Sequence, residues 1–293
     1  MIPIRKLVVI GVGLIGGSFA LALKAGNHVQ HVVGIGRSQA NLDRARALGV
    51  IDEVADDLGV AIDGADFVLV ATPVGAMAGV FERIAPHLGA GCSVTDGGST
   101  KQGVVAAARA GLGPRVAAFV PAHPIAGSEA SGADAAQVDL YAGREVILTP
   151  LPENAADTVA RVRSAWQQCG ARVTQMEPAE HDAVLAAVSH LPHLLSYVFM
   201  EELAQRTDAP GLLTHAGTGF RDFTRLAASH SEMWRDICLA NRVPLLVEVR
   251  RFEAALARFV ALLEQGDAAG LARVFGTARD ARRGWLPLQG DDR

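Results

Sequence analysis

The chain has 293 residues, of which 50% are hydrophobic and 20% are charged, and its net charge is −4. This length favours two domains of ordinary size, and the composition excludes a disordered or low-complexity chain. The negative charge disfavours a broad basic face of the kind that binds nucleic acid, so we expect no nucleic-acid partner.

The cysteines and the N-terminal region bear on compartment and metal binding. Cys92, Cys169 and Cys238 lie far apart, and no Cys/His cluster has the spacing of metal ligands. We therefore expect no metal and a reducing, cytoplasmic location. The uncharged stretch Leu7–Leu23 imitates a signal peptide, but its glycines disfavour a helix. No other stretch looks long enough to cross a bilayer, so no membrane partner is expected.

The first part of the chain alternates short apolar runs with helical stretches. The pattern predicts strands at 6–10, 31–35, 66–71, 92–95, 117–121, 144–149 and 171–176, with helices at 14–25, 39–48, 76–87, 101–110 and 153–169. Strands that alternate with helices of this length are typical of βαβ units and a parallel sheet. We therefore predict an α/β, doubly wound domain over residues 1–176.

The remainder, 177–293, is predicted to be all-α. Two apolar stripes recur with the helical period, at positions 184, 188, 191, 195 and 198 and at 245, 249, 252, 256, 259 and 263. So many apolar helices in a short segment favour burial shared between two subunits. We expect a homodimer formed through this part, followed by a polar tail at 289–293.

A glycine-rich turn follows the first predicted strand and opens the first helix. It reads Gly11-Val-Gly13-Leu14-Ile15-Gly16, which in this context is a dinucleotide-binding fingerprint. Gly11 permits the tight turn, Gly13 lets a pyrophosphate approach the backbone, and Gly16 lets the helix pack close to the strand. The N-terminus of the helix then offers N–H groups to the phosphates. The alternative is a plain glycine turn.

The end of the second strand bears on the choice of cofactor. An acidic residue there accepts hydrogen bonds from the ribose of NAD, but this chain has Gly36-Arg37-Ser38. A cation and a hydroxyl favour NADP, with NAD still possible, unless Arg37 is only a solvated surface residue. Thr72 and Pro73 end the strong central strand, where they border the cofactor or form a simple turn.

Four further patches combine polar residues with glycines or strand ends. They are TDGGSTK at 95–101, HPIAGSEASG at 123–132, SHLPH at 189–193, and GFRDFTR at 219–225, the last followed by Trp234. Together with GVGLIGGS at 11–18, these motifs resemble the prephenate/arogenate dehydrogenase family of tyrosine biosynthesis. They occur in the family's order, and the resemblance extends from Lys6 to about Asn241.

The resemblance implies a Rossmann-like domain followed by an all-α helical dimerisation domain. It also implies oxidative decarboxylation of prephenate, arogenate or both by hydride transfer to NAD(P)+. The products would be 4-hydroxyphenylpyruvate or tyrosine.

The same resemblance implies roles for individual residues. His123 corresponds to the catalytic histidine, which takes the proton of the ring C4 hydroxyl, and histidine suits this task because its pKa lies near working pH. Ser99 corresponds to a serine near the same hydroxyl and the nicotinamide. Arg225 corresponds to the arginine that holds the ring carboxylate, to which a planar guanidinium is well matched. Further pocket residues implied by the family are Glu129, His193, Asp222, Trp234 and Thr218.

Several readings stay open at this point. His123 could be a turn residue, His190 and His193 could be satisfied core histidines, and Asp222 and Arg225 could form a surface ion pair. Pro192 is expected to kink its helix. The chain could also be another NADP-dependent dehydrogenase of the β-hydroxyacid or imine-reductase kind, or a non-catalytic NADP-sensing module. The sequence does not decide between prephenate and arogenate.

Overall fold

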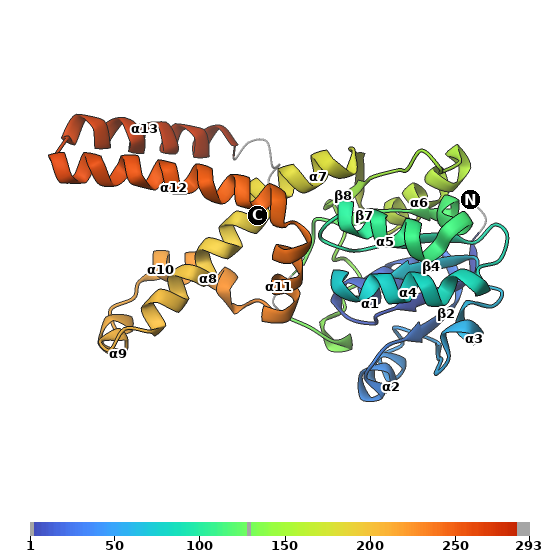
Figure 1. Ribbon diagram of the computed structural model, residues 1–293. Coiled ribbons are helices and arrows are strands. Elements are labelled where there is room, and N and C mark those ends of the chain that lie inside the picture. Colours follow the sequence, from blue (N-terminus) through green and yellow to red (C-terminus); the bar gives the residue numbers. More distant parts are fainter. Residues whose placement is uncertain (1–2, 128–129, 286–293) are drawn as a thin grey trace. The chain divides into compact units, whose positions relative to one another are not determined.

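The computed structural model describes residues 3–127 and 130–285. The chain divides into two compact units, Met1–Leu245 and Leu246–Arg293. The first unit contains both sheets and the helices up to α11, and the second contains most of a helical hairpin (Figure 1).

A six-stranded parallel sheet forms the centre of the first unit. Its strand order is β3-β2-β1-β4-β5-β6, which is the order of doubly wound dinucleotide-binding domains and confirms the predicted fold class. The strands are β1 Ile4–Ile10, β2 Val29–Ile35, β3 Glu53–Val54, β4 Phe67–Val70, β5 Ser93–Asp96 and β6 Phe119–Val120. Every residue of β4 and β5 is buried, because helices cover both faces.

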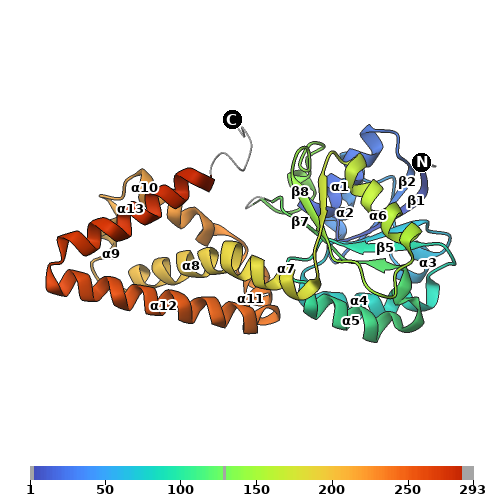
Figure 2. The same cartoon turned by 90° about the horizontal axis from the view of Figure 1, so that it is seen from above.

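Helices pack on each face of this sheet and create two apolar cores (Figure 2). The helices are α1 Leu14–Ala25, α2 Gln39–Ala47, α3 Leu58–Ile62, α4 Met77–Ile84, α5 Gln102–Leu112 and α6 Ala156–Gln168. On one face, Phe19 of α1 packs edge-on against Trp166 of α6, with ring centroids 4.6 Å apart. On the other face, Phe81 of α4 packs against Phe119 at 5.0 Å. The short elements β3 and α3 were not predicted.

A second, three-stranded sheet has the order β7-β8-β9 and was also not predicted. Its strands are β7 Ala122–Pro124, β8 Glu145–Leu148 and β9 Arg172–Gln175, and β7 runs antiparallel to β8. A parallel connection needs a long crossover, usually through a helix. Between β7 and β8 the described residues form only the short 3-10 turn Ala133–Ala135, so β8 pairs antiparallel instead of extending the large sheet.

The described residues after β9 form helices and no strand, as predicted. The first unit continues with α7 Pro178–Leu185, a π-helical segment Ala186–His190, α8 Leu191–Ala204, α9 Ala209–Leu213, α10 Thr218–Thr224 and α11 Ser231–Ala240. Pro192 lies in the first turn of α8, directly after the π-helical segment. The irregularity expected at Pro192 therefore takes the form of a π segment, which accommodates a residue without an N–H.

The second unit is an antiparallel helical hairpin. α12 Arg242–Gln265 begins in the first unit, and α13 Ala268–Trp285 follows a turn in which Gly266 has φ +62°. Phe259 and Phe275 pack across the hairpin with centroids 5.8 Å apart. These contacts hold the two helices side by side, as both ribbon views show.

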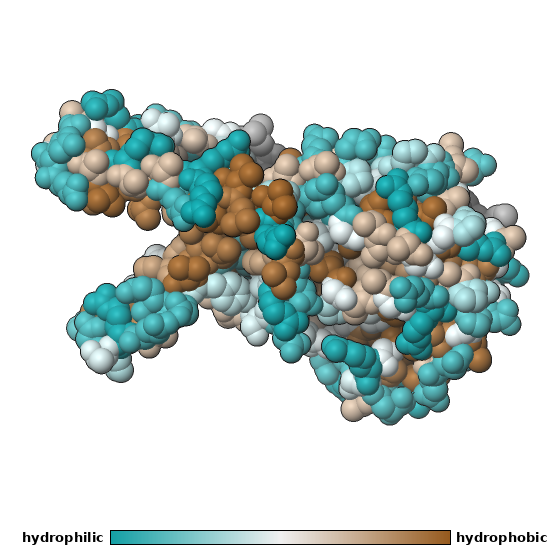
Figure 3. Space-filling view, in the orientation of Figure 1, coloured by the Kyte–Doolittle hydropathy of each residue, from teal (hydrophilic) through white to brown (hydrophobic). Residues whose placement is uncertain are grey.

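Several residues of the predicted apolar stripes face solvent in the single chain, whereas Leu245 is buried. Val188 is 69% exposed and Val198 is 55% exposed, and Val184 belongs to the same exposed set. Figure 3 shows brown, apolar surface over these helices.

One helix among the described residues, Pro178–Ala204, is long and apolar enough to cross a membrane by length and composition, and it was not predicted from the sequence. This is weak evidence, since helices of soluble proteins pass the same test. The helix carries His181 and Asp182, which are fully buried and bind groups of the sheet domain. The stretch Leu7–Leu23, whose sequence imitates a signal peptide, is divided between β1, the glycine turn and α1.

Candidate active site

The glycine loop after β1 has the geometry that a dinucleotide requires. Gly11 has φ +99°, and a Cβ there would lie 2.6 Å from the carbonyl oxygen of Ala71. A Cβ at Gly16 would lie 2.7 Å from the side chain of Val9, so this glycine permits the close contact between helix and strand. At Gly13 a Cβ would meet nothing within 4 Å, so this side of the loop is open.

The N-terminus of α1 is available to an anion. Gly13 caps the helix without a side-chain hydrogen bond, and the first turn, which begins Leu14-Ile15, contains no acidic residue. The carbonyl of Ile15 accepts a hydrogen bond from the Tyr141 hydroxyl at 2.6 Å, which anchors the turn from behind. The first backbone N–H groups of the helix and its positive dipole end can therefore serve phosphate oxygens.

The end of β2 carries Arg37 and Ser38, both exposed. Ser38 caps α2, because its Oγ accepts a hydrogen bond from the backbone N–H of Asn41 at 3.3 Å. Its hydroxyl hydrogen is left to donate elsewhere. α2 has no acidic residue in its first turn. This corner of the fold thus combines a guanidinium, a hydroxyl donor and a helix N-terminus.

Thr72 and Pro73 follow β4 on the same edge of the sheet. The Thr72 hydroxyl is buried and finds no hydrogen-bond partner among the described residues. A Cβ at Gly75, just beyond, would lie 2.8 Å from Oδ2 of Asp236 in α11. The turn after β4 therefore lies between the glycine loop and the helical part, where a buried hydroxyl lacks a partner.

The loops after β1, β5 and β6 meet beside this turn. A Cβ at Gly97 would lie 2.8 Å from the side chain of Ile15 and 3.9 Å from that of Pro124. In an open α/β sheet, ligands bind beyond the carboxyl ends of the strands, near the point where the strand order reverses. His123 precedes Pro124, so the structure brings it and the glycine loop to the same edge.

A buried ion pair holds the backbone just before His123. Lys101 Nζ lies 2.5 Å from Oδ2 of Asp96 and donates to the carbonyl of Ala122 at 2.7 Å. Asp96 Oδ1 accepts from the N–H of Ala122 at 2.9 Å. Burial lowers the pKa of Lys101, while the carboxylate of Asp96 opposes this shift. These roles of the acid and the lysine of the TDGGSTK motif were not predicted from the sequence.

His123 is buried, and its ring is hydrogen-bonded to another histidine. Its Nδ1 lies 2.8 Å from Nε2 of His181, whose Nδ1 lies 2.8 Å from Oδ1 of Asp182. Burial, followed by the nearby His181 and Lys101, lowers the pKa of His123 well below 6.5, so its ring is neutral at neutral pH. His181 and Asp182 were missed by sequence reasoning. A His-Asp pair at the start of an apolar helix was the available signal.

His190 is one of the satisfied core histidines that the sequence left open. Its Nδ1 accepts a hydrogen bond from Nδ2 of Asn241 at 2.9 Å, and it makes a further hydrogen bond with the backbone of Ser99. Burial lowers its pKa to about 4. His190 therefore connects the loop that bears Ser99 to the helices.

His193 and Trp234 are stacked, with ring centroids 3.8 Å apart and planes 19° apart. Nδ1 of His193 donates to the carbonyl of Ser189 at 2.9 Å, so Nε2 of a neutral ring can accept from a ligand. Burial lowers the pKa of His193, and Arg225 lies close enough to lower it further. The structure thus groups His193, Trp234 and Arg225.

Other predicted residues are not brought to this group within the chain. Thr218 and Asp222 are exposed on α10, which is held to α8 by a 3.0 Å hydrogen bond from Ser196 to the carbonyl of Phe223. Glu129 lies outside the described residues. No group of side chains among the described residues has the arrangement of a metal site.

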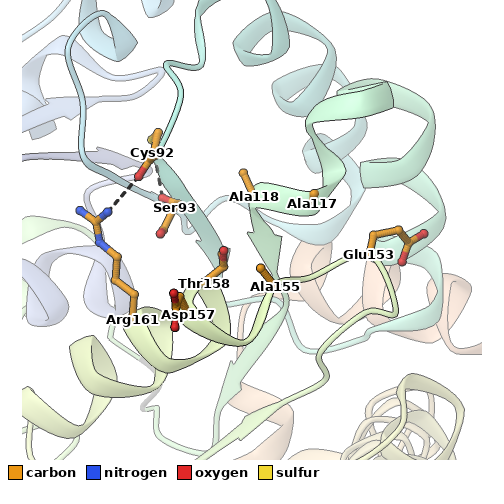
Figure 4. Close-up of a pocket in the computed structure, with 10 residues that line it drawn as sticks. Cys92, Ser93, Ala117, Ala118, Glu153, Ala155, Asp157, Thr158 and Arg161 are labelled. Carbon is orange, nitrogen blue, oxygen red and sulfur yellow. Dashed lines mark hydrogen bonds between the residues drawn. The ribbon is translucent and has the colours of Figure 1, made fainter.

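A pocket of about 400 Å³ lies elsewhere in the first unit (Figure 4). It is lined by the start of β5, the segment before β6 and the first turns of α6, where Arg161 donates to the carbonyl of Gly91 at 2.9 Å. Its lining includes none of the predicted site residues. It lies at the amino ends of the strands, away from the edge that binds ligands in such sheets.

Both parts of the chain are similar to domains of known prephenate dehydrogenases. The family model described as the prephenate dehydrogenase nucleotide-binding domain matches residues 19–175, and the prephenate dehydrogenase dimerization domain matches residues 177–277. A cyclohexadienyl dehydrogenase of Zymomonas mobilis is 35% identical over 284 residues, covering 96% of each chain. A prephenate dehydrogenase of Bacillus subtilis is 37% identical over 97% of this chain and 76% of its own.

Solved structures show the same likeness. The prephenate dehydrogenase from A. aeolicus, in complex with hydroxyphenyl propionate and NAD+, is 31% identical with a TM-score of 0.90, covering 97% of this chain and 99% of that one. The arogenate dehydrogenase of Synechocystis is 26% identical with a TM-score of 0.80, covering 96% and 100% of the two chains.

Proposed function

The chain belongs to the prephenate dehydrogenase family, and from this premise we propose that it oxidises and decarboxylates prephenate, arogenate or both. The observation that carries the proposal is the place of His123, a buried neutral imidazole beside the glycine loop at the carboxyl edge of the sheet. The products would be 4-hydroxyphenylpyruvate from prephenate and tyrosine from arogenate.

The residues present fit an NAD(P) cofactor. The open side of Gly13, the N-terminus of α1, which has no side-chain cap, and the Thr72 hydroxyl, which has no partner among the described residues, would together hold a dinucleotide. The remaining residues of this proposed site are Gly11, Leu14, Ile15, Gly16 and Pro73. A dinucleotide held there would supply the hydride acceptor for the substrate.

His123 would manage the proton of this reaction. As hydride leaves ring carbon C4, Nε2 of His123 takes the proton of the C4 hydroxyl, and Ser99 would hydrogen-bond near the same hydroxyl. C4 then carries a carbonyl, and loss of CO2 leaves an aromatic phenolate, which takes up a proton to give the phenol. Because aromatisation drives that loss, the chain mainly has to orient the donor carbon and accept one proton.

Arg225 would hold the ring carboxylate, since a guanidinium fork binds a carboxylate in a fixed orientation. Its proximity to the stacked pair His193 and Trp234 supports this assignment. The remaining proposed pocket residues are Glu129, Asp222 and Thr218. Thr218 would lie near the end at which a keto acid and an amino acid differ, which leaves the substrate preference to be measured.

NADP is the proposed preferred cofactor, with NAD as the alternative. Arg37 is exposed and has no carboxylate neighbour in the first turn of α2, so its charge is available to a 2′-phosphate. The spare hydrogen of the Ser38 hydroxyl and the N-terminus of α2 point to the same anion.

The two parts of the chain are proposed to have different roles. Residues 1–176 would bind the cofactor, and residues 177–293 would form a homodimer that covers the exposed apolar stripe of Val184, Val188 and Val198. The three cysteines are free, which agrees with a cytoplasmic location. Sedimentation velocity at micromolar concentration should show a dimer, and a monomer would refute this part of the proposal.

A two-by-two assay tests the function. Purified protein is given prephenate or arogenate with NAD+ or NADP+, and the reduced cofactor is followed at its absorbance maximum. We expect turnover of at least one cyclohexadienyl substrate, faster at limiting NADP+ than at limiting NAD+. Turnover of a simple β-hydroxyacid with neither of these substrates oxidised would favour another dehydrogenase class, and nucleotide binding without any turnover would favour a sensing module.

A further inference from the structure

A chain of three hydrogen-bonded side chains runs from the helical part to the candidate base. Asp182 and His181 lie on α7, and His123 lies on β7 of the other part of the same unit. The two links are both 2.8 Å long, from Asp182 Oδ1 to His181 Nδ1 and from His181 Nε2 to His123 Nδ1. All three side chains are buried.

Asp182, at the carboxylate end of this hydrogen-bonded series, serves only as a hydrogen-bond acceptor. Asp182 Oδ1 accepts from the backbone N–H of Lys101 at 2.7 Å, and Oδ2 accepts from that of Gln102 at 2.9 Å. Burial opposes the charged carboxylate, but hydrogen bonds from His181 and from these two N–H groups outweigh it and lower the pKa of Asp182. Asp182 has no hydrogen to give, so Nδ1 of His181 must donate.

The hydrogen on Nδ1 of His181 determines which ring nitrogens of His181 and His123 carry the other hydrogens. Burial lowers the pKa of His181 and outweighs the opposing hydrogen bond with Asp182, so the ring is neutral at neutral pH and its Nε2 carries a lone pair. An acceptor at that position requires a hydrogen on Nδ1 of His123. Since His123 is also neutral, its own Nε2 is left without a hydrogen.

We propose that His181 and Asp182 are positioning residues, which hold His123 in the Nδ1–H tautomer and so present its Nε2 lone pair to the substrate hydroxyl. This inference rests on the proposed function for its catalytic consequence. When Nε2 accepts the substrate proton, the resulting imidazolium keeps its hydrogen bond to His181, behind which lies the charge of Asp182. Neither positioning residue touches the substrate or gains a proton in the step.

The backbone of His123 is positioned independently of its ring. The peptide of Ala122 is bound on its N–H side by Asp96 and on its carbonyl side by Lys101. A variant at His181 therefore releases the ring while the backbone stays anchored. Such a variant should change the orientation of the His123 ring while β7 keeps its position.

Two variants of His181 separate hydrogen bonding from packing. His181→Gln places an amide oxygen where Nε2 was, so it can still accept from His123, whereas His181→Leu fills similar space without an acceptor. We expect kcat of the Leu variant to fall about 100-fold, with the KM of the substrate and the Kd of the cofactor little changed. The Gln variant should recover at least about tenfold of that loss. Equal losses in the two variants, or an unimpaired Leu variant, would overturn the proposal.

The tautomers themselves can be read without any turnover. In ¹⁵N-labelled wild-type protein near pH 7, long-range ¹H–¹⁵N correlations distinguish Nδ1–H from Nε2–H rings, and spectra of His123→Asn and His181→Gln assign the two residues. We expect both histidines as neutral Nδ1–H rings, and an Nε2–H tautomer at His123 would overturn the proposal. Because this readout needs no substrate, it separates failure of the positioning role from failure of the proposed function, which wild-type inactivity on both substrates would reveal.

Discussion

Lys101 and Asp96 form an ion pair of 2.5 Å in which neither side chain has any exposed surface. Together they bind both sides of the Ala122 peptide, immediately before His123. Removing one member of a buried pair is strongly destabilising, because the other charge is left without compensation. The pair therefore couples the stability of the fold to the placement of the candidate base.

Replacement of Lys101 by methionine tests this coupling. Lys101→Met should lower the free energy of unfolding by about 3–5 kcal/mol, since Asp96 would remain as an uncompensated buried charge. Urea unfolding followed by circular dichroism measures the change. The double variant Asp96→Asn/Lys101→Met is the control and should recover more than about 1 kcal/mol of the loss, since no buried charge remains. A single variant as stable as the wild type would contradict this account.

The stability of the protein should depend on the protonation of His190. Its pKa is about 4 in the folded state and 6.5 in the reference state, so the unfolded chain binds more protons between these values. The contribution of His190 is therefore fully present above pH 6.5 and is lost as pH falls toward 4, by about 3 kcal/mol. His123 and His181 shift in the same direction and add to the loss.

The measurement is urea unfolding at pH 7 and at pH 4.5, for wild type and His190→Gln. Carboxylates with lowered pKa values also contribute less to the free energy of unfolding in acid. The difference between the two proteins therefore isolates the contribution of His190. We expect a flatter pH dependence for the variant. Parallel pH dependences would show that His190 is not the group responsible.

Sequence reasoning succeeded where local pattern and chemistry coincide. The glycine loop was predictable because Gly11, Gly13 and Gly16 stand between a buried strand and a helix, and the structure shows the turn, the open side and the close packing expected of each. The parallel sheet was predictable because continuous apolar runs alternate with helices. The strand order then followed the doubly wound pattern.

What the sequence missed depends on contacts between distant segments. β3 has two residues, which is too short for a periodic pattern. Three of these contacts join residues that are 22 to 81 positions apart in the sequence. They are the pairing of β7 with β8 and the hydrogen bonds that link Asp182 to Lys101 and His181 to His123. No local spacing encodes them. His190 also shows this, since its partner Asn241 decides that it is a core residue.

Substrate binding by Arg225 is testable through steady-state kinetics. Arg225→Ala should raise the KM of the cyclohexadienyl substrate by about 10- to 100-fold, with a smaller change in kcat, because it removes a contact made in both the ground state and the transition state. Arg225→Lys keeps the charge but not the fork and should give an intermediate KM. A KM for the Ala variant equal to that of wild type would exclude this contact.

The cofactor preference is testable at Arg37. Arg37→Ala should lower the ratio of NADP+ to NAD+ affinity about tenfold, since it removes one charge from the proposed 2′-phosphate site. Isothermal titration calorimetry with each nucleotide measures the ratio. Arg46→Ala is a control with the same charge change, because Arg46 is an exposed arginine of α2, the helix that follows Arg37, and is paired with Asp43. An equal effect of the two variants would indicate general electrostatics and not a specific contact.

His123→Asn, measured for both turnover and cofactor binding, tests whether His123 is the base of the reaction. Asparagine can still donate to Nε2 of His181, but it has no group at the position of the proton-accepting Nε2. We expect kcat for the cyclohexadienyl substrate to fall by about 10³-fold, while the Kd of NADP+ stays within about twofold of wild type. A variant whose kcat stayed within a few-fold of wild type would contradict the assignment of His123 as the base.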